Sequence, residues 1–426
     1  MDITAAFGQR VTQLSQRDPD KARRFLLLGW RANGLKNRLQ RGNRSKSDRM
    51  LFQAVNAAMV NCLARPEKNV MVSLFTPCEP LLTQGLLPYS CEAFSSYLSG
   101  SMAEESFLRH AEDAGIPTSL CSYHKVFIGA AQMALMPRPR FILNTSLACD
   151  ANTLTFRYLA EHYGVPHFSI DIPYEQTPQA VDYVAGQLRE MSGFLEAQTG
   201  VPVDEARLIH TVGRGQRTLQ SYSDFLTQRA GKELLSDLTS ELYRTAAFHL
   251  LLGSPESEAV ARQMVLEARA AGPARGRQLL WLHTTPYWVP PLRALFDHNP
   301  KVQIVASDMS YEGYVPDADP EKPYETMAKR LVYSPFNGPA QRRIDKALKI
   351  AKQVHAEGAV WFCHWGCKHT LGGAQLGKRA FEAQGLPTLL LDGDSCDRGF
   401  GGEGQAATRM EAFLELLNAQ AEGGTA

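Results

Sequence analysis

The chain has 426 residues, of which 44% are hydrophobic and 21% are charged, and its formal net charge is +1. This length exceeds one ordinary hydrophobic core and predicts two or three domains. The near-zero charge argues against a nucleic-acid or membrane-surface partner. The start MDITAAFGQR lacks the basic and apolar regions of a signal peptide, and no apolar run approaches the roughly 18 residues of a membrane span. We therefore predict a cytoplasmic protein with no nucleic-acid or membrane partner.

The amino-terminal part, residues 1–67, shows no convincing strand pattern and is predicted to be a helical segment. Its stretch 31–49 carries seven Lys or Arg residues against one Asp. Such a run is either a solvated helix face and loop or a basic patch that meets phosphate groups or an acidic partner. The sequence leaves both interpretations open.

From residue 68 onward, short apolar runs alternate with amphipathic stretches in two blocks. We expect a first α/β domain at 68–200, a helical connection at 201–259 and a second α/β domain at 260–426. The predicted strands lie at 69–75, 140–146, 166–174, 277–284, 301–308, 359–365 and 387–394. This alternation predicts the α/β class, with two Rossmann- or flavodoxin-like parallel-sheet domains that follow a helical amino-terminal segment.

The eight cysteines are scattered along the chain, which does not suit the disulfide framework of a small secreted domain. Any single one is most simply an inert buried thiol. In open α/β sheets, however, sites form outside the carboxyl ends of strands. Several cysteines fall at predicted strand ends, namely Cys78, Cys149, Cys363, Cys367 and Cys396. Another, Cys121, immediately precedes a predicted helix, whose N-terminus would lower the thiol pKa and favour the thiolate.

The segment from Cys363 to Cys367, Cys-His-Trp-Gly-Cys, is the densest candidate site. With His364 and His369 beside it, the segment admits zinc, although zinc sites usually pair two short cysteine clips. Iron–sulfur clusters also use cysteine thiolates, and these can come from separate loops. No P-loop, GxSxG or HExxH motif is present, which removes the simplest ATPase and hydrolase interpretations. The residues alone leave zinc, a cluster and an absence of metal open.

Five segments, in order along the chain, resemble the 2-hydroxyacyl-CoA dehydratase and benzoyl-CoA reductase family. They are PCEPLLTQGLLP (77–88), CSYHK (121–125), NTSLACDANTLTFRYLAEHYGVPHFSIDIPY (144–174), HWGCKHTLG (364–372) and LDGDSCDRGFGGEGQAATRMEAFLELL (391–417). Their order over residues 68–420 is more specific than any one segment. The chain looks like a D-component-like subunit of 2-hydroxyglutaryl-CoA dehydratase.

This resemblance implies two α/β domains packed around a [4Fe–4S] cluster. Carried over by position, the ligands are Cys121, Cys149 and Cys367, which leaves one iron open to substrate. The Pro-x-Glu segment offers Glu79 as a catalytic acid or base, although a carboxylate at a helix N-terminus is an equally simple role. The resemblance also offers His364 as a hydrogen-bond donor to cluster or substrate, against the alternative of a packed strand-end histidine.

The implied reaction removes water from a 2-hydroxyacyl-CoA, whose β-hydrogen is too weakly acidic for ordinary elimination. One electron converts the thioester into a ketyl radical anion that expels the hydroxyl group and acidifies the β-proton. The electron comes from an ATP-hydrolysing activator iron–sulfur protein, and the enzyme contains a homologous second subunit or a second copy of the chain. The cofactor carries the radical chemistry, and the protein orients the substrate.

The chain departs from a plain dehydratase subunit in its extra cysteines, Cys78, Cys363 and Cys396. With the three implied ligands they make six thiolates, which would suffice for a double-cubane [8Fe–9S] cluster. Such a cluster would indicate an ATP-dependent reductase of the same superfamily, acting on a benzoyl-CoA-type or small substrate, but the Cys-Cys-x-Pro signature of that branch is missing. A non-catalytic metal-binding scaffold is the third interpretation.

Overall fold

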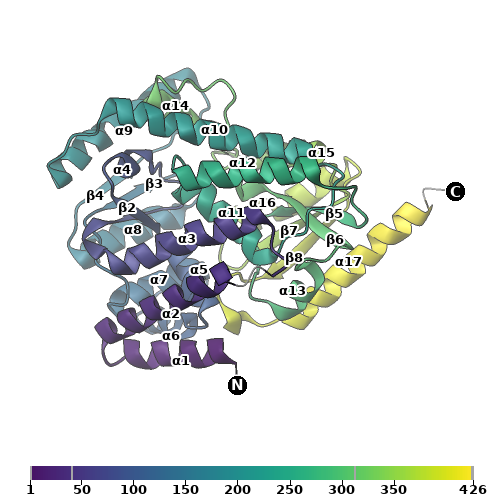
Figure 1. The fold of residues 1–426 in the computed structure, drawn as a ribbon, viewed down its shortest axis with the longest axis horizontal. Helices are drawn as coiled ribbons and strands as arrows, with labels where there is room; N and C mark the ends of the chain where they lie inside the picture. Colours follow the sequence, from purple (N-terminus) through teal and green to yellow (C-terminus); the bar gives the residue numbers. More distant parts are fainter. Residues whose placement is uncertain (1, 40–41, 311–312, 424–426) are drawn as a thin grey trace.

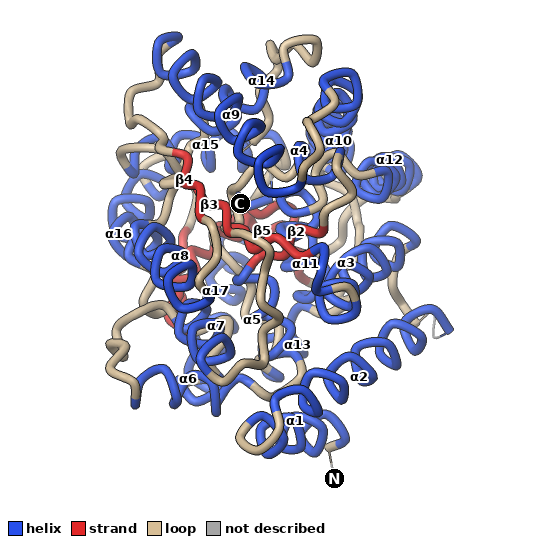
Figure 2. The backbone as a smooth tube through the Cα atoms, turned by 90° about the vertical axis from the view of Figure 1, so that its left-hand side faces the viewer, coloured by secondary structure: helices blue, strands red, loops and turns tan. Residues whose placement is uncertain are grey.

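The structure is a computed structural model that describes residues 2–39, 42–310 and 313–423. Its described part contains two four-stranded parallel sheets (Figures 1 and 2). The first sheet has the order β2-β1-β3-β4 and the second the order β6-β5-β7-β8, so both share one topology. The strands are β1 (Asn69–Val72), β2 (Leu87–Ser90), β3 (Ile142–Thr145), β4 (His167–Ile170), β5 (Arg277–Leu282), β6 (Val302–Ser307), β7 (Gly358–His364) and β8 (Thr388–Gly393). The α/β class with two parallel sheets is therefore confirmed.

Three helices form the amino-terminal segment and pack on one another, and the last of them also packs on β2 and on two later helices, α11 (Leu238–Leu250) and α12 (Pro255–Ala270) (Figure 1). They are α1 (Ile3–Ser15), α2 (Pro19–Leu39) and α3 (Lys46–Ala64). The helices of the first sheet are α4 (Glu79–Thr83), α5 (Cys91–Gly100), α6 (Glu104–Asp113), α7 (Ser122–Gln132) and α8 (Asp150–Tyr163). Trp30 of α2 lies edge-on against Phe94 and Tyr97 of α5, and this contact anchors the amino-terminal helices to the rest of the chain.

Long helices connect the two sheets, and further helices cover the second. The connecting helices are α9 (Pro178–Thr199), α10 (Glu205–Arg229), α11 (Leu238–Leu250) and α12 (Pro255–Ala270). The second group comprises α13 (Pro290–Phe296), α15 (Ala340–Gln353), α16 (Lys368–Glu382) and α17 (Glu403–Gly423), whereas α14 (Pro323–Val332) packs on α9 and α10. The carboxyl-terminal end of α17 projects from the body of the protein (Figure 1). No helix in the described residues combines the length and apolar character needed to cross a membrane.

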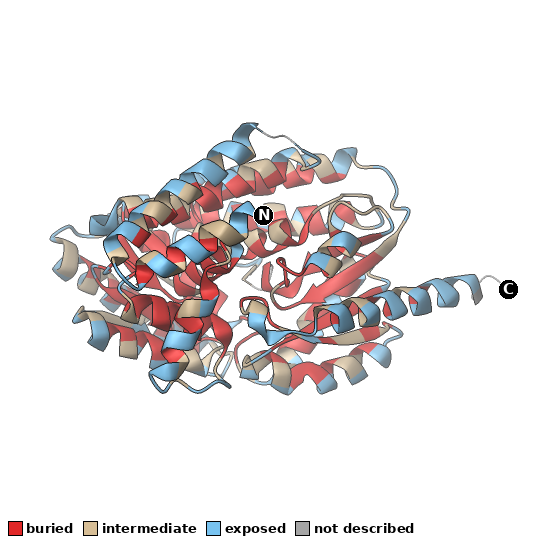
Figure 3. Cartoon of the chain, turned by 90° about the horizontal axis from the view of Figure 1, so that it is seen from below, coloured by how far each residue is buried: buried red, intermediate tan, exposed pale blue. Residues whose placement is uncertain are grey.

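Burial explains why most strands are recognisable in the sequence. Every residue of β1, β3, β6 and β7 is buried, as expected for parallel strands covered by helices on both faces. Buried residues follow the sheets and the inward helix faces, whereas the outer helix faces and much of α17 are exposed (Figure 3). The sequence pattern does not predict β2, because Leu-Pro-Tyr-Ser has no apolar run and contains proline. That proline is tolerated because β2 is an edge strand, paired only with β1.

Candidate functional site

One pocket of about 980 Å³ lies where the two sheets meet. In each sheet the strand order reverses between two central neighbours, β1 and β3 in the first and β5 and β7 in the second. Ligands of open α/β sheets bind at the carboxyl ends of the strands beside such a reversal. The pocket is lined by residues directly after all four strands, among them Phe75, Cys149, His283 and Cys367. The two crevices therefore face each other and form a single cavity.

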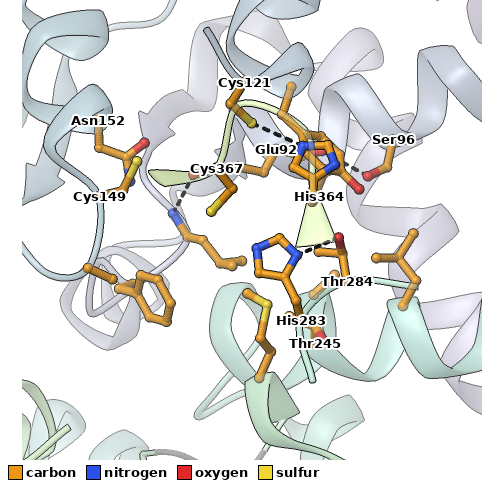
Figure 4. A pocket seen from close by; sticks show the side chains of 18 of the residues that line it. Glu92, Ser96, Cys121, Cys149, Asn152, Thr245, His283, Thr284, His364 and Cys367 are labelled. Atoms are coloured by element: carbon orange, nitrogen blue, oxygen red, sulfur yellow. Dashed lines mark hydrogen bonds between the residues drawn. The ribbon is translucent and has the colours of Figure 1, made fainter. Parts of the chain in front are cut away.

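Three cysteines line this pocket, and each one is the N-cap residue of a helix (Figure 4). Cys121 caps α7, Cys149 caps α8 and Cys367 caps α16. The backbone at Gly366, in the second domain, packs directly on the backbone at Cys121 in the first. A Cβ atom at position 366 would lie 2.5 Å from the backbone nitrogen of Cys121, so only glycine allows this close approach. The φ of +78° at Gly366 also favours glycine. The structure thus brings together the three cysteines that the family resemblance selects.

Two histidines contact the pocket thiols. His364 Nε2 lies 3.2 Å from Cys121 Sγ, and His364 Nδ1 accepts a 3.2 Å hydrogen bond from the backbone N–H of Ser395. Since Nδ1 is an acceptor, the ring proton of the neutral histidine must be on Nε2, which donates to the sulfur. His124 Nε2 lies 3.7 Å from Cys149 Sγ. His364 therefore donates its N–H group to the sulfur of Cys121, one of the three cysteines that line the pocket.

Burial controls the charge state of these groups. It lowers the pKa of His364 and lowers the pKa of His124 to about 4, so both rings are neutral at pH 7. Burial, with the nearby Cys367 thiol, raises the pKa of Cys149 to about 12 and that of Cys121 well above its ordinary value. The expected thiolate at the Cys121 helix N-terminus is thus wrong for the metal-free protein, because desolvation outweighs the helix dipole. A bound cation would reverse this balance and release the protons.

The remaining cysteines do not line the pocket. Cys363 lies within β7 and not in a strand-end loop, and its thiol faces the carbonyl oxygen of Trp361 at 3.7 Å. The Cys396 thiol lies 3.7 Å from the carbonyl oxygen of Ser95, and the Cys78 thiol is buried within 3.3 Å of a backbone oxygen. These three extra cysteines follow or belong to strands, but their thiols turn into the surrounding core.

Glu79 lies outside the cysteine pocket. It begins α4 with its side chain buried, and Oε1 lies 2.5 Å from Arg330 Nη2. The pair borders a separate cavity of about 520 Å³, which Leu74 and Phe75 divide from the cysteine pocket. The structure therefore does not bring Glu79 to the three cysteines, and it shows this carboxylate as half of a buried ion pair.

Three other polar residues of the pocket wall escape the sequence reasoning. Glu92 of α5 accepts a 2.7 Å hydrogen bond from Ser90 Oγ, and burial raises the pKa of its carboxyl group. His283 directly follows β5, so the strand-end rule would have selected it. Arg343 lies on α15 and not at a strand end, so the strand-end rule does not select it. Its Nε donates to Asp308 at 2.7 Å, which fixes a permanent positive charge beside the pocket.

The donor set suits a polynuclear cluster. In the described residues, no three His, Cys, Asp or Glu side chains stand close enough to hold one metal ion. A four-iron cluster does not need that spacing, since each thiolate binds a different iron atom. Three thiols in a mainly apolar pocket, with the N–H donor of His364 and the cation Arg343 at its wall, fit an anionic thiolate cluster.

Fold and pocket together define a two-domain α/β protein with a cysteine-lined cavity at the facing strand ends. A family model described as "2-hydroxyglutaryl-CoA dehydratase, D-component" matches residues 73–417. The chain belongs to this family, as its sequence motifs indicate.

Named relatives are subunits of dehydratases. The chain is 22% identical to the (R)-phenyllactyl-CoA dehydratase alpha subunit of Clostridium sporogenes over 344 residues, 75% of this chain and 82% of the relative. It is 22% identical to subunit alpha of (R)-2-hydroxyglutaryl-CoA dehydratase from Acidaminococcus fermentans over 309 residues, covering 67% and 62%. It is 21% identical to the lactoyl-CoA dehydratase subunit alpha of Anaerotignum propionicum over 393 residues, covering 84% and 92%. Each of these relatives is named as the alpha subunit of a dehydratase.

Proposed function

We propose that the chain is the iron–sulfur subunit of a 2-hydroxyacyl-CoA dehydratase. It would eliminate water from its substrate through a ketyl radical, after an ATP-hydrolysing activator protein has donated one electron. The observation that carries this proposal is the selective convergence of Cys121, Cys149 and Cys367 on one pocket. The family resemblance selects these three from eight cysteines, and the other five do not line the cavity.

In this proposal Cys121, Cys149 and Cys367 hold a [4Fe–4S] cluster. When bound, the cluster would supply single-electron transfer at the pocket wall. The chain itself then has three tasks: to bind the acyl group, to keep water out and to hold protons. Apolar side chains, including Leu74, Phe75 and Leu242, dominate the pocket wall and favour an apolar acyl group.

In this proposal, Glu92 is the residue that holds a proton in the pocket. Burial raises the pKa of its carboxyl group, so this side chain binds a proton more readily than a surface glutamate does. It lines the same pocket as the cysteines, whereas Glu79 does not. Arg343, which lines the same wall, forms a buried ion pair with Asp308 through Nε. Its Nη2 has no hydrogen-bond partner in the described residues and can donate to negative charge that develops on a thioester oxygen.

The double-cubane reductase receives no support from a specific structural feature. It requires six thiolates around one cluster, but Cys78, Cys363 and Cys396 do not line the pocket. We therefore retain the dehydratase as the proposed function.

The test is the iron and acid-labile sulfide content of the anaerobically purified protein. About four irons per chain are expected, and serine variants of Cys121, Cys149 and Cys367 should each lose the cluster and its EPR signal. The matched control is Cys363→Ser, in the strand that leads to Cys367, which should keep a full iron content.

About eight irons per chain, with Cys363→Ser as damaging as Cys367→Ser, would replace this proposal with the double-cubane reductase. A protein without iron after anaerobic reconstitution would refute both. The reaction itself is tested by adding a partner subunit and activator and following formation of the unsaturated acyl-CoA.

A further inference from the structure

A third cavity, of about 1080 Å³, lies beside the cysteine pocket, and we call it the outer cavity. Its wall includes Lys36, Asn37, Arg44, Tyr243, Arg293 and His298. These residues come from the carboxyl end of α2, the following loop, α11, α13 and the segment after α13. The outer cavity therefore lies where the amino-terminal helices meet the second domain.

Tyrosine side chains lie between the two cavities. Tyr243 lines both of them, and its ring stacks on Tyr97 of the cysteine pocket at 5.7 Å between centroids and 14° between planes. Tyr287 of the outer cavity donates a hydrogen bond from its hydroxyl group to the carbonyl oxygen of Ser96, which lines the cysteine pocket. A narrow chain that passed Tyr243 would therefore reach directly from one cavity to the other.

The outer cavity carries an excess of positive charge. Lys36 has no ion-pair or hydrogen-bond partner in the described part of the chain. The two arginines are paired through Nε: Arg44 with Asp237 at 3.0 Å, and Arg293 with Asp297 at 2.7 Å.

Three permanent cations thus face two carboxylates, which leaves a formal charge of +1. His298 lies 3.6 Å from Asp237, which raises the pKa of the imidazole, so this histidine adds further positive charge when protonated. Guanidinium groups bind phosphate oxygens through parallel hydrogen bonds, and an ammonium group acts as a point charge for phosphate.

Aromatic rings continue the wall from the cations towards the tyrosine layer. The guanidinium of Arg44 lies over the ring of Phe52, 3.9 Å from its centroid. Phe52 in turn contacts Tyr243, with ring centroids 4.7 Å apart. The outer cavity thus combines phosphate-binding cations with aromatic side chains that lead from the cations to Tyr243.

We propose that the outer cavity binds the phosphorylated nucleotide end of a CoA thioester, with the pantetheine arm passing Tyr243 into the cysteine pocket. This inference rests on the proposed function, because it assigns a position to the substrate of that function. It gives the basic stretch 31–49 a specific role, as a phosphate-binding wall built by Lys36 and Arg44.

The test is calorimetric titration of the full chain with 3-phenylpropanoyl-CoA, a saturated thioester that cannot be dehydrated. Lys36→Glu and Arg293→Glu should each weaken binding about tenfold or more, since a charge-assisted hydrogen bond contributes roughly 1.5–3 kcal/mol. The control Lys349→Glu makes the same charge change at an exposed residue that lines neither cavity, and it should change affinity less than about twofold. The parent protein should also bind the thioester of dephospho-CoA more weakly, and 3′,5′-ADP should compete with the full thioester.

Unchanged affinity in both charge-reversal variants would overturn the inference and leave the dehydratase proposal standing. Equal competition by ATP and 3′,5′-ADP would also overturn it, because the cavity would then be a general anion site. Failure of the parent protein to bind any CoA thioester would refute the proposed function itself. Unchanged thermal unfolding of the variants excludes misfolding as the cause of weak binding.

Discussion

The Glu79→Gln substitution separates an ion-pair role for this residue from a catalytic one. The carboxylate and Arg330 Nη2 lie 2.5 Å apart, with side-chain exposures of 1% and 7%. Neither carboxylate oxygen has a hydrogen-bond partner in the described residues, so Arg330 provides the main compensation for the negative charge. Removing one charge from a buried pair leaves the other uncompensated, which typically costs about 3–5 kcal/mol. We expect Glu79→Gln to lose free energy of unfolding in this range.

The assay is urea unfolding at pH 7, with the free-energy change taken from the midpoint shift at an unchanged m value. Glu92→Gln is the matched control, because Glu92 is also buried but lines the cysteine pocket and has a raised carboxyl pKa. An amide oxygen at the same place can still accept the hydrogen bond from Ser90 Oγ, so less than about 1 kcal/mol is expected for Glu92→Gln. The double variant Glu79→Gln/Arg330→Met should be more stable than the sum of the single effects predicts.

A loss below about 1 kcal/mol for Glu79→Gln would refute the ion-pair reasoning. A variant as stable as the parent but inactive as a dehydratase would restore Glu79 as a catalytic acid or base. The reverse pattern, with normal stability and lost activity in Glu92→Gln, is what the proposed function requires.

Three further predictions test other parts of the structure. Burial raises the pKa of Glu104 to about 7 from 4.5, so the folded state holds this proton more tightly than the unfolded state and stability falls as pH rises from 4.5 to 7. Glu104→Gln should remove this loss and gain about 3 kcal/mol over the parent between pH 4.5 and 8 in urea unfolding. Gly377→Ala places a Cβ atom 2.0 Å from the ring of Trp361 and should lower the free energy of unfolding by about 1–3 kcal/mol or more. Gly372→Ala, on the same helix, meets nothing within 4 Å and should raise the free energy of unfolding by roughly 0.5–1 kcal/mol. Thermal unfolding of the two variants compares these effects. His364→Phe removes the N–H donor to the neighbouring thiol and should lower the midpoint potential of the reconstituted cluster in an EPR-monitored redox titration.

Each of these expectations has a clear contrary result. Parallel pH profiles for the parent and Glu104→Gln would show that the carboxyl group titrates normally. Equal unfolding temperatures for the two alanine variants would contradict the close contact with the Trp361 ring. An unchanged midpoint potential in His364→Phe would mean that its N–H group does not reach the cluster sulfur.

The fold class could be predicted from the sequence because parallel strands are buried on both faces. The residues of β5 and β7 are almost continuously apolar, and such strands alternate with amphipathic helices. This pattern can be recognised in the local sequence. An edge strand such as β2 lacks that signal, because its pairing with β1 and not its composition makes it a strand. The family segments likewise select Cys121, Cys149 and Cys367, since short motifs with fixed order are local features of the chain.

Tertiary structure alone decided which side chains share a cavity. Cys363 and Cys367 are four residues apart, yet only Cys367 lines the pocket, since Cys363 belongs to a strand whose alternate side chains face opposite sides of the sheet. Glu79 follows β1 and Glu92 follows β2. Leu74 and Phe75 separate Glu79 from the cysteines, while α5 carries Glu92 to them. The sequence by itself therefore determined the class, the family and the three cysteines that line one pocket. Packing determined the acidic residue of the pocket, the neutral histidines and the raised thiol pKa values, because these depend on the burial produced by distant segments.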